Sequence, residues 1–165
     1  MATIKKERLI FGLYLLALIV VIELILHRFH LPAWPVFLVM ILFFECHMDR
    51  SRAPHLLLGG LVGIGCYMLT VEFVQLAAPL LGVATARLAF ICLVVYTIVA
   101  VGEAIPWLFN NYAFMFFLVS GLAATTEGAA PAPLAWMGVE VVGGIFVLVG
   151  VLGIRGLLAR GTATQ

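Results

Sequence analysis

The chain has 165 residues, of which 65% are hydrophobic and only 10% are charged, and its mean hydropathy is +1.22. Soluble domains carry about 25% charged residues, so this composition excludes a freely soluble protein and favours one embedded in a lipid bilayer. A net charge of +1 gives no support to nucleic-acid binding, which uses clustered basic surfaces.

Apolar runs along the chain predict an all-α membrane protein with six transmembrane helices. A helix needs about 20 apolar residues to cross the hydrocarbon core, and backbone in contact with lipid must be helical or form a closed barrel. The second run opens at Pro32, Trp34 and Pro35 and is somewhat short, whereas the third is expected to end before Pro79. The predicted spans are residues 9–26, 32–44, 56–76, 85–104, 108–124 and 134–158.

The two halves of the chain resemble each other. The first apolar run opens with Glu7-Arg8-Leu9-Ile10-Phe11, and the fourth opens with Ala86-Arg87-Leu88-Ala89-Phe90. Similar offsets align residues 37–44 with 114–121 and 60–68 with 138–146. Three spans are an odd number, so the second half enters the bilayer upside down, as in many channels and transporters. We therefore predict one transmembrane domain, residues 1–165, made of two inverted three-helix repeats at about 7–82 and 84–158.

The basic residues predict the orientation of these spans, because cytoplasmic loops carry an excess of lysine and arginine. If both termini lie in the cytoplasm, seven of the nine basic residues are inside and only Arg28 and Arg87 are outside. We therefore expect a multi-pass protein of the cell inner membrane with two cytoplasmic termini.

Four glutamates fall within the predicted spans, where an ionisable residue is costly and marks a candidate functional site. Glu23 and Glu103 lie late in the first span of each half. They are either the two mouths of a cation or proton pathway or acids that reach headgroup water. Glu72, with Gln75 one turn further on, and Glu140 have no lysine or arginine three or four residues away. We expect Glu72 and Glu140 to face a shared polar cavity between the halves.

Two amides, Asn110 and Asn111, begin the fifth span shortly after Pro106. One of them can be the N-cap of this helix, since asparagine is a favoured cap. The other would then enter the hydrocarbon and need a hydrogen-bond partner, for example along a constriction of the pathway. Both amides are therefore candidate pathway residues, and a simple cap is the competing interpretation.

Glu23, His27 and His30 are spaced by four and three residues, which places them on one face of a continuous helix. Two histidines and a carboxylate form a metal-ligand set, so a metal-handling membrane protein is one alternative function. The competing interpretation is a polar cluster at the membrane surface. Apart from this candidate metal site, no cofactor is expected.

Glycines gather in the third and sixth predicted spans and predict close helix packing. Gly59 and Gly63 have the spacing that lets two membrane helices approach closely, and Gly60 lies between them. Gly143 and Gly144 occupy the matching span of the second half. We expect contacts here between the repeats or between subunits of a homo-oligomer or larger membrane complex. Leucine at Gly63 should disrupt the packing, whereas alanine should be tolerated.

The segment from Pro32-Ala33-Trp34 to Phe43-Phe44, followed by residues 60–65 and the terminal glycine-rich span, resembles an uncharacterised family of small six-span bacterial inner-membrane proteins. Members of that family are about this length and carry a similar aromatic segment in the second half. They have a glycine-rich turn after the second span, where this chain has the charged loop 45–52. The resemblance implies a topology and an inner-membrane location but no activity.

These features together predict a channel or a proton-linked secondary transporter for a small solute or ion. The chain has no G-x-x-x-x-G-K-[ST] motif with which nucleotide hydrolysis would power it. It also has no catalytic constellation at span depth, so we do not expect an enzyme. The alternative to transport is a non-transporting membrane subunit or an assembly factor that packs in a larger complex.

Overall fold

Apolar segments of two different lengths give this protein two kinds of helix. The computed structural model describes residues 6–126 and 132–162, and within these ranges the chain forms six α-helices and one short 3-10 turn. The elements are α1 (Lys6–Arg28), α2 (Trp34–Glu45), η1 (Arg50–Arg52), α3 (Ala53–Leu81), α4 (Val83–Gly102), α5 (Asn111–Thr126) and α6 (Pro133–Thr162).

Four of the described helices, α1, α3, α4 and α6, are long and apolar enough to cross a membrane. The 12 residues of α2 and the 16 residues of α5 extend about 18 and 24 Å, short of a hydrocarbon core of about 30 Å. Helices α3 and α6, with 29 and 30 residues, are about 45 Å long and fit such a core when they are tilted. The predicted all-α class is confirmed, and the chain is a membrane-embedded helical protein.

The end of α1 shows how local sequence stops an otherwise apolar helix. The amide of Leu31 donates to the carbonyl of Leu26 at 2.9 Å, and the amide of His30 donates to the carbonyl of His27 at 3.1 Å. His30 has a φ of 53°, in the left-handed region. These features define a Schellman motif, which satisfies the last carbonyl groups of the helix and turns the chain away from its axis.

The third helix is longer than the sequence predicts. It continues through Pro79 and ends at Leu81, so the expected end before this proline is wrong. Pro79 lies in the last turn, where the missing N–H removes a single intrahelical hydrogen bond. The chain reverses at Gly82, whose φ of 78° favours a residue without a Cβ.

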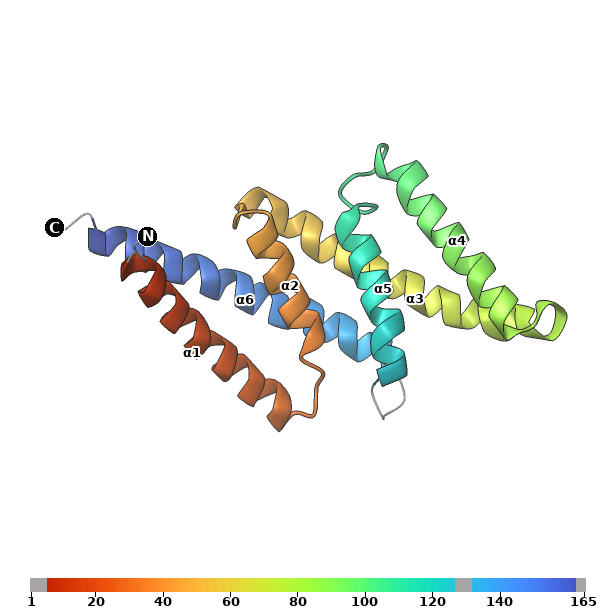
Figure 1. Ribbon diagram of the computed structural model, residues 1–165, viewed down its shortest axis with the longest axis horizontal. Helices are drawn as coiled ribbons and strands as arrows, with labels where there is room; N and C mark the ends of the chain where they lie inside the picture. The colour runs from red at the N-terminus through yellow and green to blue at the C-terminus, as the bar shows by residue number, and fades with distance from the viewer. Residues whose placement is uncertain (1–5, 127–131, 163–165) are drawn as a thin grey trace, which may run out of the picture.

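The two longest helices exchange partners between the halves of the chain. Helix α3 packs mainly against α5 and α4 of the second half, whereas α6 packs against α2 and, to a smaller extent, α1 of the first half. Helices α3 and α6 also contact each other, more extensively than α6 contacts α1. Figure 1 shows the resulting elongated shape, with α1 at one end, α4 at the other, and α2 and α5 on either side of the centre. The chain is therefore not divided into two separate three-helix bundles.

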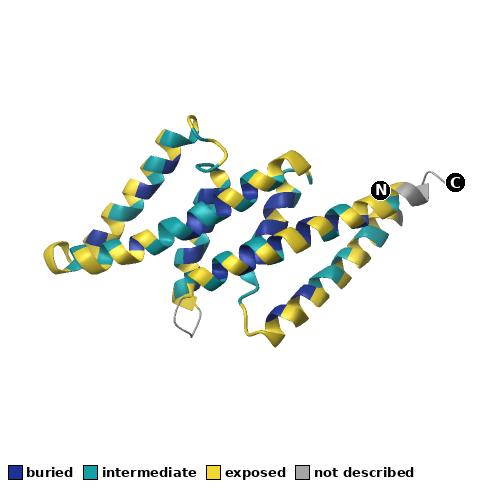
Figure 2. Cartoon of the chain, turned by 180° about the vertical axis from the view of Figure 1, so that it is seen from behind, coloured by how far each residue is buried: buried dark blue, intermediate teal, exposed yellow. Residues whose placement is uncertain are grey.

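The apolar core lies where the short helices meet the long ones. Val39 and Phe43 of α2, Phe116 of α5 and Val147 of α6 are all 0% exposed. A second, smaller cluster joins α4 to α5 and α3. Figure 2 shows buried residues gathered around this centre, whereas much of α1 and α4 is exposed. The exposed residues on these outer helices are mostly apolar, as expected for surfaces in contact with lipid.

Candidate functional site

Helices α3 and α5 approach each other closely at Gly63. A Cβ atom placed there would overlap the carbonyl oxygen of Ala113 and lie 2.7 Å from Cβ of Phe116 and 2.8 Å from N of Phe117. Two of these atoms belong to the backbone, which cannot move aside without shifting the helix. The expectation that alanine is tolerated at Gly63 therefore does not fit the structure.

One turn earlier on α3, Gly59 faces the side chain of Asn110, and a Cβ there would lie 2.5 Å from its Oδ1 atom. The second half has a comparable contact between α6 and α2. A Cβ on Gly143 would overlap Cγ2 of Val36, and a Cβ on Gly144 would lie 3.2 Å from Cγ2 of Val39. In both halves glycines thus bring a long helix close to a short one.

The carboxyl group of Glu140 lies where α6 meets α3. Glu140 is 0% exposed. A Cβ placed on Gly60 would lie 2.5 Å from its Oε1 atom and 3.1 Å from Cε2 of Phe116. Gly60 therefore provides the space that the carboxyl group occupies. Within the described part of the chain, neither carboxyl oxygen makes a hydrogen bond.

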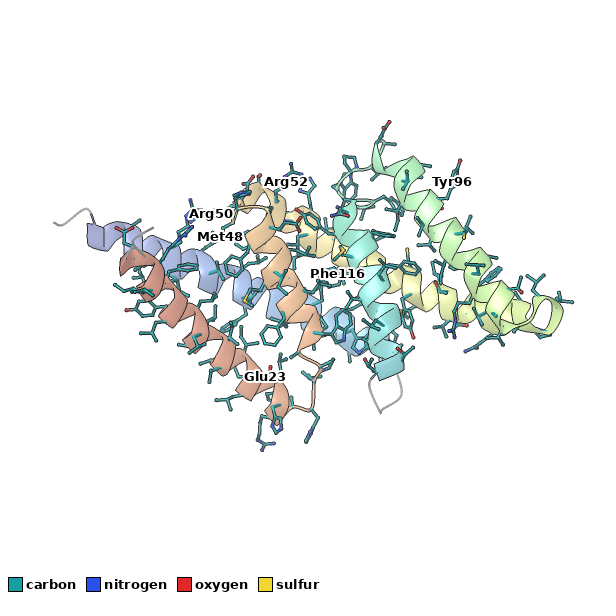
Figure 3. The ribbon with its side chains drawn as sticks, viewed as in Figure 1. Glu23, Met48, Arg50, Arg52, Tyr96 and Phe116 are labelled. Carbon is teal, nitrogen blue, oxygen red and sulfur yellow. The ribbon has the colours of Figure 1, made fainter. Side chains whose placement is uncertain are left out.

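Four aromatic side chains from four helices form a connected cluster beside this carboxyl group. Trp34 of α2 lies 5.4 Å from Trp136 of α6 and 6.2 Å from Phe116 of α5, measured between ring centroids. Tyr67 of α3 lies 5.7 Å from Trp136. Figure 3 shows Phe116 in the middle of the molecule. Tyr67 and Trp136 are not among the site residues that the sequence predicts, although the spacing of four between Trp136 and Glu140 places both on one face of α6.

The surroundings of Glu140 favour the neutral form of its carboxyl group over the ionised form. The indole Nε1 of Trp34 is buried and, like the carboxyl oxygens, has no hydrogen-bond partner among the described residues. An ionised carboxylate in such a place is costly, since no counter-charge or donor compensates for lost hydration, whereas a neutral carboxylic acid costs much less. The site can therefore hold a proton and can release it only when water or another charge reaches it.

The other embedded acids lie elsewhere. Glu72 and Gln75 are on the exposed surface of α3, Glu23 is exposed on α1, and Glu103 is exposed at the C-cap of α4. The structure therefore does not bring Glu72 and Glu140 into the shared cavity that the sequence predicts. Depth in a predicted span says nothing about the direction in which a side chain points, and these acids point away from the centre.

Gln75 does line a recess, together with Tyr67, Thr70 and Arg87, between α3, α4 and α5. The recess has a volume of about 410 Å³. The hydroxyl of Thr70 is already used, because it donates to the carbonyl of Cys66 at 2.8 Å. The recess is separate from Glu140, which is not among its lining residues.

The two amides at the start of α5 have different positions. Asn110 is the cap: its Oδ1 accepts from the amide of Ala113 at 3.1 Å. Its Nδ2 donates to the carbonyls of Pro106 at 3.1 Å and His55 at 3.2 Å, so it also ties α5 to α3. Asn111 is exposed and lines a surface recess of about 460 Å³. Asn110 is therefore satisfied as a structural group, and Asn111 faces outward.

The candidate metal ligands do not share the face that their spacing predicts. Glu23 and His27 lie on α1, but the helix ends at Arg28 and His30 follows in the left-handed turn. Among the described residues no group of three or more histidine, cysteine, aspartate or glutamate side chains is arranged to hold a metal ion. The Schellman motif thus separates the third ligand from the other two.

Comparison of the chain with protein-family models, with curated proteins and with solved structures finds no match. The candidate site is therefore defined by its own geometry: a buried carboxyl group, the glycine that makes room for it, and an aromatic cluster from four helices.

Proposed function

We propose that this protein is a proton-linked secondary transporter of a small solute, built from two inverted three-helix repeats, with Glu140 as the group that carries the proton. The observation on which the proposal depends is the fully buried carboxyl group of Glu140, without a hydrogen bond in the described chain, at the contact between α3 and α6. Ionisable residues in membrane helices are costly and mark ion or proton pathways.

The position of Glu140 within its helix supports the inverted repeat. Gly60 is the eighth residue of α3 (Ala53–Leu81), and Glu140 is the eighth residue of α6 (Pro133–Thr162). Counting by position in the helix pairs Gly60 with Glu140, two residues beyond Gly138, with which the sequence alignment of residues 60–68 and 138–146 pairs it. Gly60 and Glu140 face each other. If a two-fold axis relates α3 to α6, it places each residue of α3 and its equivalent in α6 on opposite sides of the axis and at the same distance from it. Two equivalent residues can therefore be in contact only close to the axis. The contact between Gly60 and Glu140 is what such an axis requires.

The glycine contacts support the same relation. Gly63 and Gly143 are each the eleventh residue of a long helix, and they contact Ala113 and Val36, each the third residue of a short helix. The exchange of partners follows the same rule, because α3 takes α5 and α4 while α6 takes α2 and α1. In Figure 1, a half-turn in the plane of the page carries α1 onto α4 and α2 onto α5.

We further propose an inner-membrane location with both termini in the cytoplasm, from the distribution of basic residues along the sequence. The start of α1 and the end of α6 lie near each other in Figure 1, as two termini on one side of the membrane would. An impermeant thiol reagent should label a single cysteine at Ala84 in intact cells lacking the native cysteines. Failure to label this position would contradict the orientation.

Inverted repeats give this arrangement a mechanism. Two halves of opposite orientation place one site between them, and rocking of one half against the other opens that site to each side in turn. Glu140 would take up a proton when water reaches it from one side and release it on the other. The aromatic cluster around Trp136 would keep the carboxyl group out of water between these two states.

The first experiment tests protonation directly and needs no knowledge of the solute. Infrared spectra of the purified protein in liposomes would be recorded across a pH titration. We expect a carboxylic-acid C=O band at neutral pH that disappears in Glu140→Gln and persists in the matched variant Glu72→Gln, in which the carboxyl group of Glu140 is unchanged. A spectrum unchanged by Glu140→Gln would show that Glu140 is not protonated and would overturn its role as proton carrier.

The second experiment tests transport. Proteoliposomes containing a pH-sensitive dye would be exposed to sugars, amino acids, monocarboxylates, Na⁺ and K⁺ in turn. We expect at least one of these to move protons across the wild-type membrane, and Glu140→Gln to abolish that movement. If the wild type behaves like empty liposomes with every solute, the transport proposal fails. The chain would then be better described as a non-transporting membrane subunit.

The membrane-subunit function is the second candidate because of one feature of the surface. An apolar groove of about 570 Å³ runs between α1 and α6, lined by residues such as Ile25, Phe29, Val142 and Phe146. A neighbouring helix or lipid chains would fill it equally well. Size determination of the purified protein, corrected for bound detergent, would separate a monomer from a homo-oligomer.

A further inference from the structure

A basic recess opens where the loop after α2 passes the C-terminal part of α6. Its volume is about 620 Å³, and its lining includes His47, Arg50, Leu152, Arg155 and Gly156. Arg50 comes from η1 and Arg155 comes from α6, so two guanidinium groups from distant parts of the sequence reach one hollow. This site is separate from Glu140 and does not depend on the transport proposal.

The backbone that presents Arg50 is firmly held. Helix α2 ends in a Schellman motif, in which the amide of Met48 donates to the carbonyl of Phe43 at 3.0 Å and His47 has a φ of 57°. Asp49 then caps η1, accepting from the amide of Ser51 at 2.9 Å and from its hydroxyl at 2.8 Å. Figure 3 shows Met48 and Arg50 beside α6.

The charges in the recess leave room for an anion. The backbone amide and the hydroxyl of Ser51 lower the pKa of Asp49, which is therefore ionised at neutral pH. Its carboxylate is occupied by these two donors, and within the described ranges neither Arg50 nor Arg155 forms an ion pair. Two guanidinium groups thus face one carboxylate that is already engaged, and the recess has an excess of positive charge.

The wall formed by α6 is apolar and open. Leu152, Arg155, Gly156 and Ala159 follow the three- and four-residue spacing of one helix face. A Cβ on Gly156 would meet no atom within 4 Å, so this glycine leaves free space beside Arg155. The same face of α6 continues one and two turns earlier with Val149 and Ile145, which are exposed apolar side chains. A charged pocket therefore continues directly into a surface that faces lipid.

From this combination we propose that the recess binds the phosphate headgroup of an anionic phospholipid, with its acyl chains along α6. Arginine guanidinium groups bind phosphate oxygens through paired hydrogen bonds. Basic pockets between membrane helices are known sites for anionic headgroups. A soluble anion would use the arginines but would gain nothing from the apolar wall.

The test uses the full chain purified in detergent, with native mass spectrometry to count and titrate bound lipid. Phosphatidylglycerol is the probe, phosphatidylcholine is the zwitterionic comparison, and inorganic phosphate is the soluble-anion comparison. We expect one phosphatidylglycerol to bind more tightly than phosphatidylcholine, with affinity reduced about 5-fold by Arg50→Gln or Arg155→Gln and about 30-fold by the double variant.

Two further variants separate a built site from general surface charge. Gly156→Leu fills the open space without changing charge and should also weaken phosphatidylglycerol binding. Arg52→Gln is the matched control, because Arg52 is two residues from Arg50 and close to Asp49 but does not line this recess; it lines an adjacent recess that shares His47 and Asp49. Thermal unfolding should be the same in all of these variants, whose altered residues are exposed.

Three outcomes would overturn the proposal. The first is equal binding of phosphatidylcholine, and the second is a loss with Arg52→Gln as large as with Arg50→Gln, since both indicate a diffuse attraction to the membrane surface. The third is displacement of phosphatidylglycerol by an equal concentration of inorganic phosphate, which would indicate a site for a soluble anion.

Discussion

Where α3 crosses α5, the helices meet backbone to backbone, and where α6 crosses α2, they meet through valine side chains. At the first crossing a Cβ on Gly63 would strike the carbonyl oxygen of Ala113, and at the second a Cβ on Gly143 would strike Cγ2 of Val36. Both glycines hold the same place in their helices, but the first contact is rigid and the second has side chains that can adjust. Similar packing in the two halves thus allows different tolerance to change.

The eighth residues of α3 and α6 differ even more. The first half has Gly60 and the second has Glu140, and the absence of a side chain in one is what accommodates the carboxyl group of the other. A strictly symmetric pair would hold either two carboxyl groups or none at this contact. Under the inverted repeat that we propose, the chemistry of the centre depends on this one departure from symmetry.

The largest expected effect comes from adding a side chain at Gly63, where α3 crosses α5. Gly63→Leu should prevent the α3–α5 contact and yield aggregated protein, because no side chain fits between these backbones. Gly63→Ala should lower the free energy of unfolding by about 1–3 kcal/mol, and Gly143→Ala should lower it less. Size-exclusion chromatography and thermal unfolding in detergent would measure both. Equal melting temperatures for the two alanine variants would remove the distinction between the crossings.

Replacing Glu140, the eighth residue of α6, with an apolar residue should stabilise the protein. Glu140→Met keeps a side chain of similar length and removes two buried oxygens without hydrogen-bond partners among the described residues. Unsatisfied buried polar groups cost about 1–3 kcal/mol, so unfolding should require that much more free energy. Proton movement in proteoliposomes should be lost in the same variant. A destabilised Glu140→Met would instead indicate that the carboxyl group has a stabilising partner.

A double-mutant cycle would measure the energetic coupling between Gly60 and Glu140. Gly60→Ala should destabilise the wild type, because the new Cβ would lie 2.5 Å from Oε1 of Glu140. In the Glu140→Ala background that contact is gone, and the cost should shrink by an interaction energy of about 0.5–3 kcal/mol. Additive effects would place the two residues out of contact. Gly121→Ala, where a Cβ would meet no atom within 4 Å, is the matched control.

The smallest expected effect concerns the starts of the short helices. Helix α5 is capped by the side chain of Asn110, whereas α2 has a proline as its second residue and no side-chain cap. Asn110→Ala should lower the free energy of unfolding by about 1–2 kcal/mol. The adjacent exposed residue provides the comparison, because Asn111→Ala should stay within about 0.5 kcal/mol of the wild type. The reverse order in thermal unfolding would contradict the assignment of the cap.

Much of the fold follows from the sequence, because apolar runs define helices almost independently of their partners. The predicted spans 9–26 and 85–104 lie close to α1 and α4. The direction in which a side chain faces does not follow in the same way, because helices of a membrane protein are apolar on all sides. Glu72 and Glu140 look alike in sequence, and only the crossing partners of α3 and α6 make one exposed and the other buried.

Turns set a second limit on prediction. The spacing of Glu23, His27 and His30 assumes a continuous helix, but the left-handed turn at His30 ends that continuity, and the only nearby signal in the sequence is Pro32, two residues further on. Conversely, Pro79 announces an end that comes two residues later. For the amides, the sequence predicts that either Asn110 or Asn111 caps the helix but does not say which. The hydrogen bond from the amide of Ala113 identifies Asn110 as the cap.

The exchange of long helices between the halves has a consequence for biosynthesis. Helices α1 and α2 leave the ribosome first, yet the helix against which both mainly pack is α6, the last described helix of the chain. The third helix, in turn, mainly packs against α4 and α5, which are made after it. The helices of the first half are therefore inserted before their main packing partners are synthesised, and their packing surfaces stay uncovered until the second half is made. Cells making this protein must keep those early helices from other partners until translation ends.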